Sequence, residues 1–282
     1  MNVIFLLSRY TYFFENVIKE IIKISKVDRV SVVYWDNDHL PIEPTLDIKK
    51  INLVRRIDFD LKLLLSFSGP NLVYLPGWMD KGYLYQVEKL KNEFLLITCM
   101  GFDDQWHGTI RQILGSIYFR LFIKKFIDFA WIAGPPQYFY ARKFGFSNER
   151  IIYNLLSSFF CNDFLPNTLE GKNYVKKFIF VGRLVKEKNL ENLLQAFSFI
   201  DSNLFHLEIV GDGPLFNDLV KYAKHNIIFR GYLPPISVIK QLKSCDVFIM
   251  PSIHEQWSVA VHEAVSLGLV LNSSKYVGAN SR

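Results

Sequence analysis

The chain has 282 residues, of which 50% are hydrophobic and 16% are aromatic, and its formal net charge is +6. This composition excludes a disordered polypeptide and supplies enough apolar side chains for one large or two ordinary domains. Charged residues interrupt the longest apolar stretches, so the sequence predicts no membrane-spanning helix. The three cysteines are far apart, in neither a zinc-binding nor a disulfide pattern, and we expect a cytoplasmic protein.

Short apolar runs recur through the first half of the chain. They predict buried strands at residues 3–7, 30–35, 72–76 and 95–100, with helices at 16–24 and 83–92. After Ser157, the stretch "SSFFCNDFLPNTLEGKN" is rich in Pro, Gly, Asn and Asp, which is typical of a linker. We therefore expect an N-terminal lobe over residues 1–165 and a linker over residues 166–176.

The second half, residues 177–282, alternates strictly between strand and helix patterns. The predicted strands are 178–182, 207–211, 227–231, 247–251 and 269–272, and the predicted helices are 189–200, 215–225, 236–243 and 259–267. Such alternation predicts an α/β protein with parallel sheets and helices on both faces. Ligands of such folds bind at the carboxyl ends of the strands, here in a cleft between the two halves. Because the pattern stops just after a strand, we expect the second lobe to be incomplete.

Two cations follow the first strand of the second half, in the sequence "GRLVKEKN" over residues 182–189. Arg183 and Lys188 stand in a strand-to-helix loop, where guanidinium, ammonium and backbone N–H groups can bind a diphosphate together. The alternative is that both are solvated loop charges, and the two interpretations have about equal weight.

The next strand is followed by "VGDGP", residues 210–214. Gly211 and Gly213 allow close backbone approach and positive φ values. A dinucleotide-binding fingerprint would need a third glycine at the position of Phe216. By itself, the segment is therefore interpreted as a turn in which Pro214 begins a helix.

A third segment, "PSIHEQWSVAVHEA", leaves a strand at residue 251. Ser258 is a candidate N-cap for a helix that begins at Val259, so Glu255 falls in the loop and Glu263 inside the helix. The N–H groups at residues 258–260 direct the positive end of the helix dipole toward the predicted cleft, where an anion could bind between the two carboxylates. The alternative is a capped surface helix with a glutamate on either side.

The order of these three segments, with "FRGYLP" before the last, resembles the C-terminal domain of the retaining glycosyltransferases of family 4, which have the two-lobed GT-B fold. The resemblance covers about residues 176–279 and rests on "GRLVKEKN…LLQAF", "LEIVGDGP" and "PSIHEQWSVAVHEAVSLGLVL". In the first half it is weaker and rests on "GFDDQWHGTIRQ" and "RKFGFSNERIIYN". It implies two Rossmann-like lobes, 1–165 and 177–282, the second one truncated.

The resemblance also implies roles for individual residues. Arg183 and Lys188 would bind the donor diphosphate and stabilise it as it leaves, in place of a metal ion. Glu263 would accept hydrogen bonds from the ribose, and Glu255 would contact the transferred sugar near the reacting carbon. The remaining donor-binding positions are Gly211, Gly213, Arg230, Tyr232, Ser258 and Val259, with Arg230 and Tyr232 flanking the base through their backbone. Ser258 departs from the family, which usually has glycine there, and the glycine-rich turn after the first strand is missing.

In the first half, "CMGFDDQWHGT" leaves a strand toward the predicted cleft. Asp103, Asp104, Trp106 and His107 could contact the acceptor or the sugar, and His107 is our candidate for the catalytic histidine of this lobe. A helix-capping aspartate and a structural histidine are equally compatible with the sequence.

The segment "RQILGSIYFRLFIKKF", residues 111–126, mixes basic residues with Ile, Leu and Phe at helical spacing. It belongs to a basic region, 111–143, that could lie on an anionic membrane surface; the alternative is an ordinary amphipathic helix with a solvated basic face. Nucleic-acid binding is disfavoured because no recognition motif accompanies the charge.

We therefore expect a metal-independent, retaining glycosyltransferase. It would have no cofactor and would move a sugar from a UDP- or GDP-sugar to a glycan or lipid-linked acceptor, in cell-surface polysaccharide synthesis. It would act in the cytoplasm or peripherally at the inner face of the membrane. The alternative is an inactive truncated paralogue or a partner subunit of another transferase. A nucleotide-binding dehydrogenase is disfavoured because the glycine fingerprint is absent.

Overall fold

A computed structural model describes residues 1–8, 12–35, 51–156 and 176–280. The contacts divide the chain into two compact units, Met1–Leu155 and Leu156–Arg282. The expected linker, 166–176, lies outside the described residues except for its last position. Each unit has its own apolar core, the first packed around strands and helices of residues 4–151 and the second around those of residues 179–277.

The first unit is built on a seven-stranded sheet in the order β3-β2-β1-β4-β5-β6-β7. Every pair of neighbouring strands is parallel. The strands are β1 (Asn2–Leu6), β2 (Arg29–Tyr34), β3 (Ile51–Arg55), β4 (Asn71–Leu75), β5 (Leu96–Phe102), β6 (Phe129–Ile132) and β7 (Ile151–Ile152). The four strands predicted from apolar runs are confirmed as β1, β2, β4 and β5.

Three strands of this sheet escaped the sequence analysis. The segment of β3, "INLVR", has only two consecutive apolar residues, Leu53 and Val54, and β7 has only two residues in all. The segment of β6 lies at the end of the aromatic stretch whose spacing suggests a helix. The sheet-edge position of β3 explains its mixed sequence, because an edge strand does not need to be apolar on both faces, whereas β7 is too short to give a pattern.

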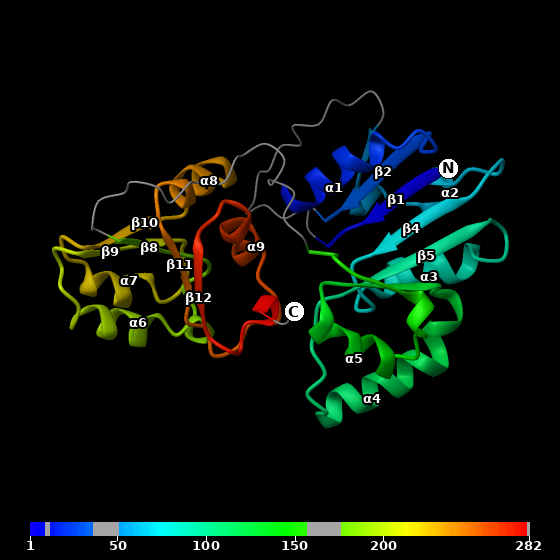
Figure 1. The fold of residues 1–282 in the computed structure, drawn as a ribbon. Helices are drawn as coiled ribbons and strands as arrows, with labels where there is room; N and C mark the ends of the chain where they lie inside the picture. Colours follow the sequence, from blue (N-terminus) through cyan, green and yellow to red (C-terminus); the bar gives the residue numbers. More distant parts are fainter. Residues whose placement is uncertain (9–11, 36–50, 157–175, 281–282) are drawn as a thin grey trace. The chain divides into compact units, whose positions relative to one another are not determined.

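The helices of the first unit are α1 (Tyr12–Ile22), α2 (Leu61–Leu64), α3 (Lys81–Leu90), α4 (Ile110–Tyr118) and α5 (Pro135–Lys143). A π-helical turn, Phe119–Ile123, and a 3-10 turn, Lys124–Phe126, continue α4. The strand order reverses at β1, and right-handed crossovers then place α1 on one face of the sheet and α3, α4 and α5 on the other (Figure 1).

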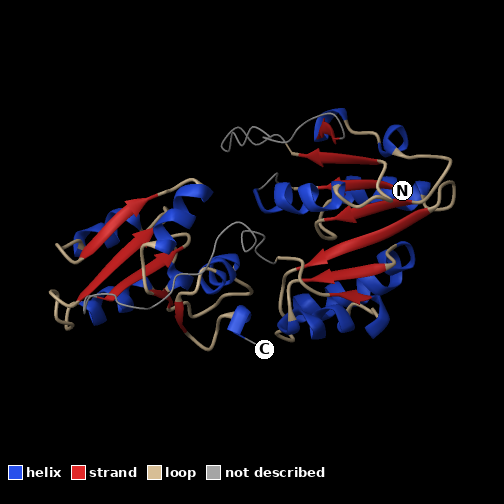
Figure 2. Ribbon diagram, turned by 45° about the horizontal axis from the view of Figure 1, so that its top comes forward, coloured by secondary structure: helices blue, strands red, loops and turns tan. Residues whose placement is uncertain are grey.

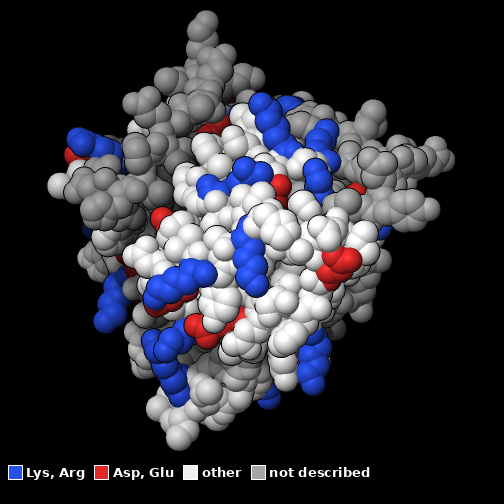
Figure 3. All heavy atoms as spheres, turned by 90° about the vertical axis from the view of Figure 1, so that its left-hand side faces the viewer, with Lys and Arg blue, Asp and Glu red and all other residues white. Residues whose placement is uncertain are grey.

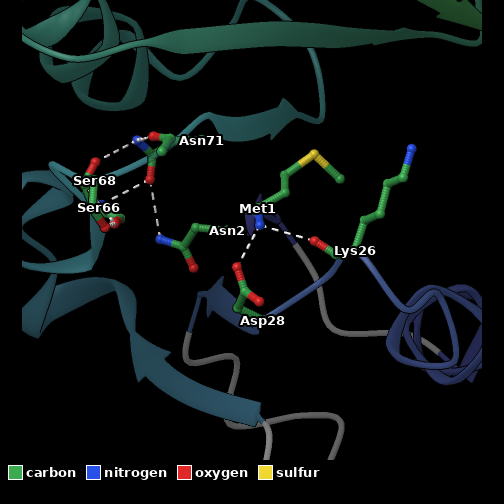
Figure 4. A network of polar contacts seen from close by, with 8 residues as sticks. Met1, Asn2, Lys26, Asp28, Ser66, Ser68 and Asn71 are labelled. Carbon is green, nitrogen blue, oxygen red and sulfur yellow. Dashed lines mark hydrogen bonds and ion pairs between the residues drawn. The ribbon is translucent and has the colours of Figure 1, made fainter.

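Polar contacts tie the amino-terminal edge of this sheet together (Figure 4). The amino group of Met1 pairs with the carboxylate of Asp28, next to the start of β2. Asn2 begins β1 and Asn71 begins the neighbouring strand β4, and Asn2 Nδ2 donates to Asn71 Oδ1 at 3.2 Å. Asn71 Oδ1 also accepts from the backbone N–H of Ser66 at 2.8 Å. These contacts fix the starts of β1, β2 and β4, so this edge is structural and ligand-binding groups are to be sought at the opposite edge.

The second unit has a five-stranded parallel sheet in the order β10-β9-β8-β11-β12. Its elements are β8 (Lys176–Val181), α6 (Leu190–Phe197), β9 (Phe205–Val210), α7 (Phe216–Leu219), β10 (Ile227–Gly231), α8 (Pro235–Lys243), β11 (Val247–Met250), α9 (Val259–Ser266) and β12 (Val270–Ser273). Figure 2 shows helices on both sides of these strands. The alternation predicted from the sequence is confirmed strand by strand.

One predicted helix is shorter than expected. The helix predicted over 215–225 is the four-residue α7 followed by a 3-10 turn, Val220–Tyr222. An antiparallel bridge between Lys224 and Ile227 then turns the chain into β10, so no room remains for a longer helix. At the other edge of the sheet, Val270 on β12 is 51% exposed, and the incompleteness of this lobe stays a prediction.

In the parts of the chain that the structure describes, no helix has the length and apolar character that crossing a bilayer requires. Figure 3 views the molecule from the side on which β9 and β10 are labelled in Figure 1. On this face, lysine and arginine side chains are dispersed and have acidic side chains between them. The basic excess of the chain therefore does not form one continuous track on this face.

Candidate functional site

The second unit has its strand-order reversal at β8, which lies between β9 and β11. In open α/β sheets, the crevice at the carboxyl ends of the strands beside such a reversal is the ordinary ligand site. The loops that leave β8 and β11 at this point are residues 182–189 and 251–258. They carry Arg183, Lys188 and Glu255, so the topology brings together the loops that the sequence analysis singled out.

The loop after β8 places its two cations differently. The Arg183 side chain is exposed, whereas Lys188 is the last residue of a 3-10 turn, Lys186–Lys188, and is largely buried. The next residue, Asn189, has a left-handed backbone (φ 55°) and precedes α6. Its side-chain Nδ2 donates to the carbonyl of Pro251 at 3.3 Å, which links the loop after β8 to the start of the loop after β11.

Lys188 and Glu255 form an ion pair between the two loops. Their side chains are only 14% and 17% exposed, respectively, so the pair is largely removed from water. Burial, and next the positive charge of Arg183, lower the pKa of Lys188 to about 8. Arg183 is therefore close enough to act on the Lys188 ammonium, and the site holds two cations and one carboxylate.

The backbone around Glu255 is fixed by two other segments. The N–H of Ile253 donates to the carbonyl of Glu187 at 2.9 Å. On the other side, Glu255 N–H donates to the Tyr276 carbonyl at 3.2 Å, and Gly278 N–H donates to the Glu255 carbonyl at 2.9 Å. We call residues 274–278 the strap. The strap and the Lys186–Lys188 turn hold Glu255 in place, so the carboxylate is preorganised.

The helix after this loop begins where the sequence predicts. Ser258 is the N-cap of α9, and its side chain accepts from the N–H of Val261 at 3.4 Å. The N–H groups of Val259 and Ala260, in the first turn, lack partners within the helix, as at every helix start. The Trp257 ring stacks on His262 with centroids 4.9 Å apart, and Trp257 Nε1 donates to the Leu156 carbonyl at 3.1 Å. These contacts anchor the start of α9, whose dipole favours an anion there.

Glu263 lies one turn into α9 and is only partly accessible to solvent. Burial raises the pKa of its carboxyl group to about 7. Within the described ranges, no hydrogen bond or ion pair satisfies this carboxylate. A desolvated carboxylate without a partner costs free energy in the unliganded protein and is typical of a group that a ligand completes.

Gly211 and Gly213 are explained by the loop after β8. A Cβ on Gly211 would lie 1.9 Å from the carbonyl oxygen of Gly182, and Gly211 has φ +136°. A Cβ on Gly213 would lie 2.6 Å from the carbonyl oxygen of Leu184. The N–H of Leu184 in turn donates to the Asp212 carbonyl at 2.9 Å. The turn interpretation therefore has a physical basis: both glycines let two loops pack and so position Arg183. A contact of either glycine with a ligand stays a prediction.

The two donor-binding positions around β10 differ in their surroundings. Arg230 directs its side chain at Glu208, with Nε 3.1 Å from Oε2 and Nη2 3.2 Å from Oε1. Glu208 is 8% exposed and also accepts from Gln241. The guanidinium is thus engaged in an ion pair with Glu208, and a contact of the Arg230 backbone with a ligand stays a prediction. Tyr232 lies in the loop after β10 and is 66% exposed.

His107 belongs to the first unit, in the loop between β5 and α4. Its side chain is exposed, and its backbone N–H donates to Gln112 Oε1 at 2.8 Å. Gln112 Nε2 donates to the Gln105 carbonyl at 2.7 Å, so this side chain fixes the loop against α4. The N-cap of α4 is Thr109, which corrects the alternative of an aspartate cap. Asp103 follows directly after β5 and is exposed.

The structure adds residues that the sequence analysis missed. Asn189 and the strap make contacts to the loop of Glu255 that no motif indicated. The available signal for Asn189 was an asparagine at the first position of the predicted helix, a residue type that favours the N-cap. The strap contacts Glu255 itself through backbone groups, and the Ser274 hydroxyl donates to the Ser252 carbonyl in the same loop, so only Ser274 offered a side-chain signal. Among the described residues, no group of three or more His, Cys, Asp or Glu side chains could hold a metal ion.

The arrangement in the second unit suits a phosphorylated ligand. Two cations and a helix N-terminus can stabilise negative charge, and an adjacent preorganised carboxylate can accept hydrogen bonds. Residues 166–281 match the family model described as "Glycosyl transferases group 1". The matched range includes both loops described above and α9.

A sequence relative carries a more specific name. Over 114 residues the chain is 38% identical to the UDP-Gal:alpha-D-GlcNAc-diphosphoundecaprenol alpha-1,3-galactosyltransferase of Escherichia coli. This match covers 36% of the chain and 29% of that relative. A further match, 29% identical over 99 residues, is to the uncharacterized glycosyltransferase MJ1607 of Methanocaldococcus jannaschii and covers 33% of the chain and 25% of the relative. The chain therefore matches less than a third of the length of these relatives.

The fold has a counterpart over nearly the whole chain. The Anabaena protein Alr3699/HepE, solved in complex with UDP and glucose, is similar over 99% of this chain and 82% of its own, with a TM-score of 0.65 and 15% identity. At this identity the likeness shows the fold alone. Both units have the parallel α/β fold of GT-B glycosyltransferases, as the sequence analysis expected.

Proposed function

We propose that this protein is a metal-independent, retaining glycosyltransferase of family 4. It transfers a sugar from a UDP- or GDP-sugar to a glycan or lipid-linked acceptor, in the synthesis of cell-surface polysaccharide on the cytoplasmic side of the membrane. The observation that carries the proposal is the convergence of Arg183, Lys188 and Glu255 at the strand-order reversal of the second unit.

The reaction exchanges one bond at the anomeric carbon for another. The bond from this carbon to the donor diphosphate breaks, a bond to an acceptor hydroxyl oxygen forms, and the hydroxyl proton is released. Negative charge grows on the departing diphosphate, and Arg183, Lys188 and the first turn of α9 stabilise it as it appears. Cations that are already in place supply this stabilisation without reorganisation, which is the work a divalent metal performs in other enzymes.

The two carboxylates, Glu255 and Glu263, contact the sugar and the ribose of the donor. Glu263, which lacks a partner among the described residues, accepts hydrogen bonds from the ribose hydroxyls. Glu255 lies in the loop ahead of α9 and contacts the transferred sugar near the reacting carbon. The backbone at Arg230 and Tyr232 flanks the base. In the first unit, His107 contacts the reacting sugar or the acceptor.

The comparisons support this choice of substrates. The name of the E. coli relative includes a UDP-galactose donor and an acceptor linked to diphosphoundecaprenol, and Alr3699/HepE was solved with UDP and glucose. A nucleoside diphosphate bound to a sugar is also the ligand that the two cations and the free carboxylate together fit.

Calorimetry with UDP and GDP tests the proposal. We expect Arg183→Ala and Glu263→Ala each to weaken binding of the preferred nucleotide by about tenfold or more, corresponding to ~1.4 kcal/mol. Lys186→Ala is the matched control, because Lys186 is an exposed cation two residues from Lys188. Affinities that stay unchanged in both site variants would overturn the proposal. Binding without sugar transfer would instead favour an inactive partner subunit.

Stereochemistry and metal dependence are tested separately. With a nucleotide-sugar mixture and acceptor, proton NMR of the first product formed reports the configuration at the anomeric carbon. We expect the donor configuration in the product and an unchanged rate after addition of a chelator. An inverted product, or activity that a chelator abolishes, contradicts that part of the proposal.

A further inference from the structure

We propose that α4 and the π-helical turn after it form a docking surface for an anionic lipid bilayer. We call the side chains concerned the apolar stripe: Ile110, Ile113, Leu114, Ile117 and Leu121, which are 77%, 43%, 62%, 49% and 66% exposed. Large aliphatic side chains at this exposure, gathered on one element, form the kind of apolar patch that marks an interaction site.

The stripe occupies one face of the helix. Its members follow each other at intervals of three, one, three and four residues, which places them in a row along a helix of 3.6 residues per turn. The opposite face packs into the core of the first unit, where Ser116, Phe119 and Ile123 are buried. The outer row therefore does not serve the core. Tyr118 and Phe122, 47% and 55% exposed, lie beside it and widen the apolar surface.

Positive charge accompanies the stripe on both sides. Residues 110–127 contain Arg111, Arg120, Lys124 and Lys125 and no acidic residue. Lys125 pairs with Glu88 at 2.6 Å, and Lys124 donates to the Ile127 carbonyl at 3.0 Å. Arg111 and Arg120 remain exposed. At 100° per residue, they lie on opposite sides of the stripe, each about a quarter turn away from it.

This pattern fits the boundary between lipid headgroups and acyl chains. An interfacial helix inserts its apolar face shallowly, while arginines at its flanks reach the phosphates of anionic lipids. The surface is a single protruding helix, whereas a partner helix or peptide usually needs a groove. In a twofold dimer through this surface, the positively charged patches of the two copies would face each other. Charge and shape therefore favour a bilayer over a protein.

The docking surface is separate from the residues proposed for donor binding, and its test does not depend on catalysis. If the acceptor is lipid-linked, as in the proposed function, docking here brings the first unit to the surface in which that acceptor resides. Failure of the proposed function would leave the bilayer contact intact, and failure of the bilayer contact would leave donor binding intact.

Vesicle co-sedimentation of the full chain tests the inference. The vesicles contain phosphatidylcholine alone or phosphatidylcholine with phosphatidylglycerol. We expect binding to the anionic vesicles that Leu114→Gln/Leu121→Gln reduces about fivefold or more. We expect Arg111→Gln/Arg120→Gln to bring binding down to the level seen with phosphatidylcholine alone. The control pair, Leu63→Gln/Phe199→Gln, removes two more strongly exposed side chains elsewhere, 76% and 89% exposed, and should bind as the parent does.

Circular dichroism and thermal unfolding show whether each variant is folded, which we expect because every substituted side chain is exposed. Analytical ultracentrifugation supplies the second readout. The proposal is overturned if the parent protein does not bind anionic vesicles, or if the stripe variants bind them as strongly as the parent does. A parent that is dimeric, with stripe variants that are monomeric, also overturns it, because the stripe would then be an interface between copies.

Discussion

Lys188 and Glu255, 67 positions apart in the sequence, form an ion pair in the second unit and neutralise each other's charge. Each is proposed to contact a different part of the donor, the diphosphate and the sugar, so their pairing competes with donor binding. The diphosphate must replace Glu255 as the partner of the Lys188 ammonium, and this exchange costs part of the binding free energy.

The first prediction concerns this exchange. Glu255→Gln removes the competing charge, so UDP, which has no sugar, should bind about three- to tenfold more tightly, or ~1 kcal/mol. Sugar transfer should nevertheless fall by about a hundredfold or more, because the carboxylate near the reacting carbon is lost. Calorimetry and a product assay measure the two effects. Glu191→Gln, at an exposed position in the first turn of α6, is the control and should change neither. Weaker UDP binding in Glu255→Gln would contradict the competition.

The second prediction is a bell-shaped pH dependence of UDP affinity. The pKa of Glu263 is raised to about 7, so its carboxylate becomes a full acceptor for ribose hydroxyls only above that pH. The pKa of Lys188 is lowered to about 8, so its positive charge is lost above that pH. Affinity should be highest between these values. Glu263→Gln should flatten the acid limb and Lys188→Arg the alkaline limb. A flat profile in the parent would exclude both assignments.

The third prediction is a stability effect with a defined sign. Because the folded-state pKa of Glu263, about 7, exceeds its ordinary value of 4.5, the folded protein holds a proton that the unfolded chain has released. The free energy of unfolding therefore decreases as the pH rises from 4.5 to 7 and stays lower above that range. Glu263→Gln should stabilise the protein by about 1–2 kcal/mol at pH well above 7 and leave it unchanged at pH well below 4.5.

Denaturant unfolding at the two pH values measures this effect. Glu191→Gln, on the same unit but exposed, should show no such difference between the two conditions. A gain in stability together with lost UDP affinity would identify Glu263 as a residue kept for binding at the expense of stability. If the stability difference between Glu263→Gln and the parent were the same at both pH values, the Glu263 carboxylate would not be desolvated.

The fourth prediction separates a structural arginine from the cations of the site. Arg230→Met leaves the buried carboxylate of Glu208 without its guanidinium, which should cost about 1–3 kcal/mol of folding free energy. UDP affinity should stay within about twofold, because only the backbone of Arg230 is proposed to face the base. Lys240→Met, at an exposed position on α8, is the control for loss of a surface cation. A large loss of UDP affinity at unchanged stability would place the Arg230 side chain in the donor site.

Much of the fold of the second unit could be predicted because each of its strands carries a short, largely apolar run and these runs alternate regularly with helix patterns. Ser258 could be recognised as a cap for a similar reason, since the requirement for an oxygen at that position is local. The edge strands β3 and β7 could not be predicted from the sequence, because whether an edge segment forms a strand depends on its neighbouring strand as well as on its own residues.

The site could be predicted only in part, for the same physical reason. Arg183, Lys188 and Glu255 stand in recognisable segments, but the ion pair between the last two requires two loops to meet, and that depends on strand order. The need for glycine at position 211 likewise comes from another segment, because a Cβ there would collide with the carbonyl oxygen of Gly182. The sequence of α4 does not show which of its faces packs on the core, so the exposure of the apolar stripe could not be predicted.

The strap has a consequence for how natural sequence variation around this pocket should be judged. Tyr276 and Gly278 support Glu255 through main-chain carbonyl and amide groups, and the Tyr276 ring itself is 54% exposed. Many side chains are compatible with that geometry, so we expect related chains to vary in residue type at position 276 while they keep the backbone conformation of the strap. Deleting or lengthening this tract would release the sugar-side carboxylate more surely than exchanging any one of its exposed residues.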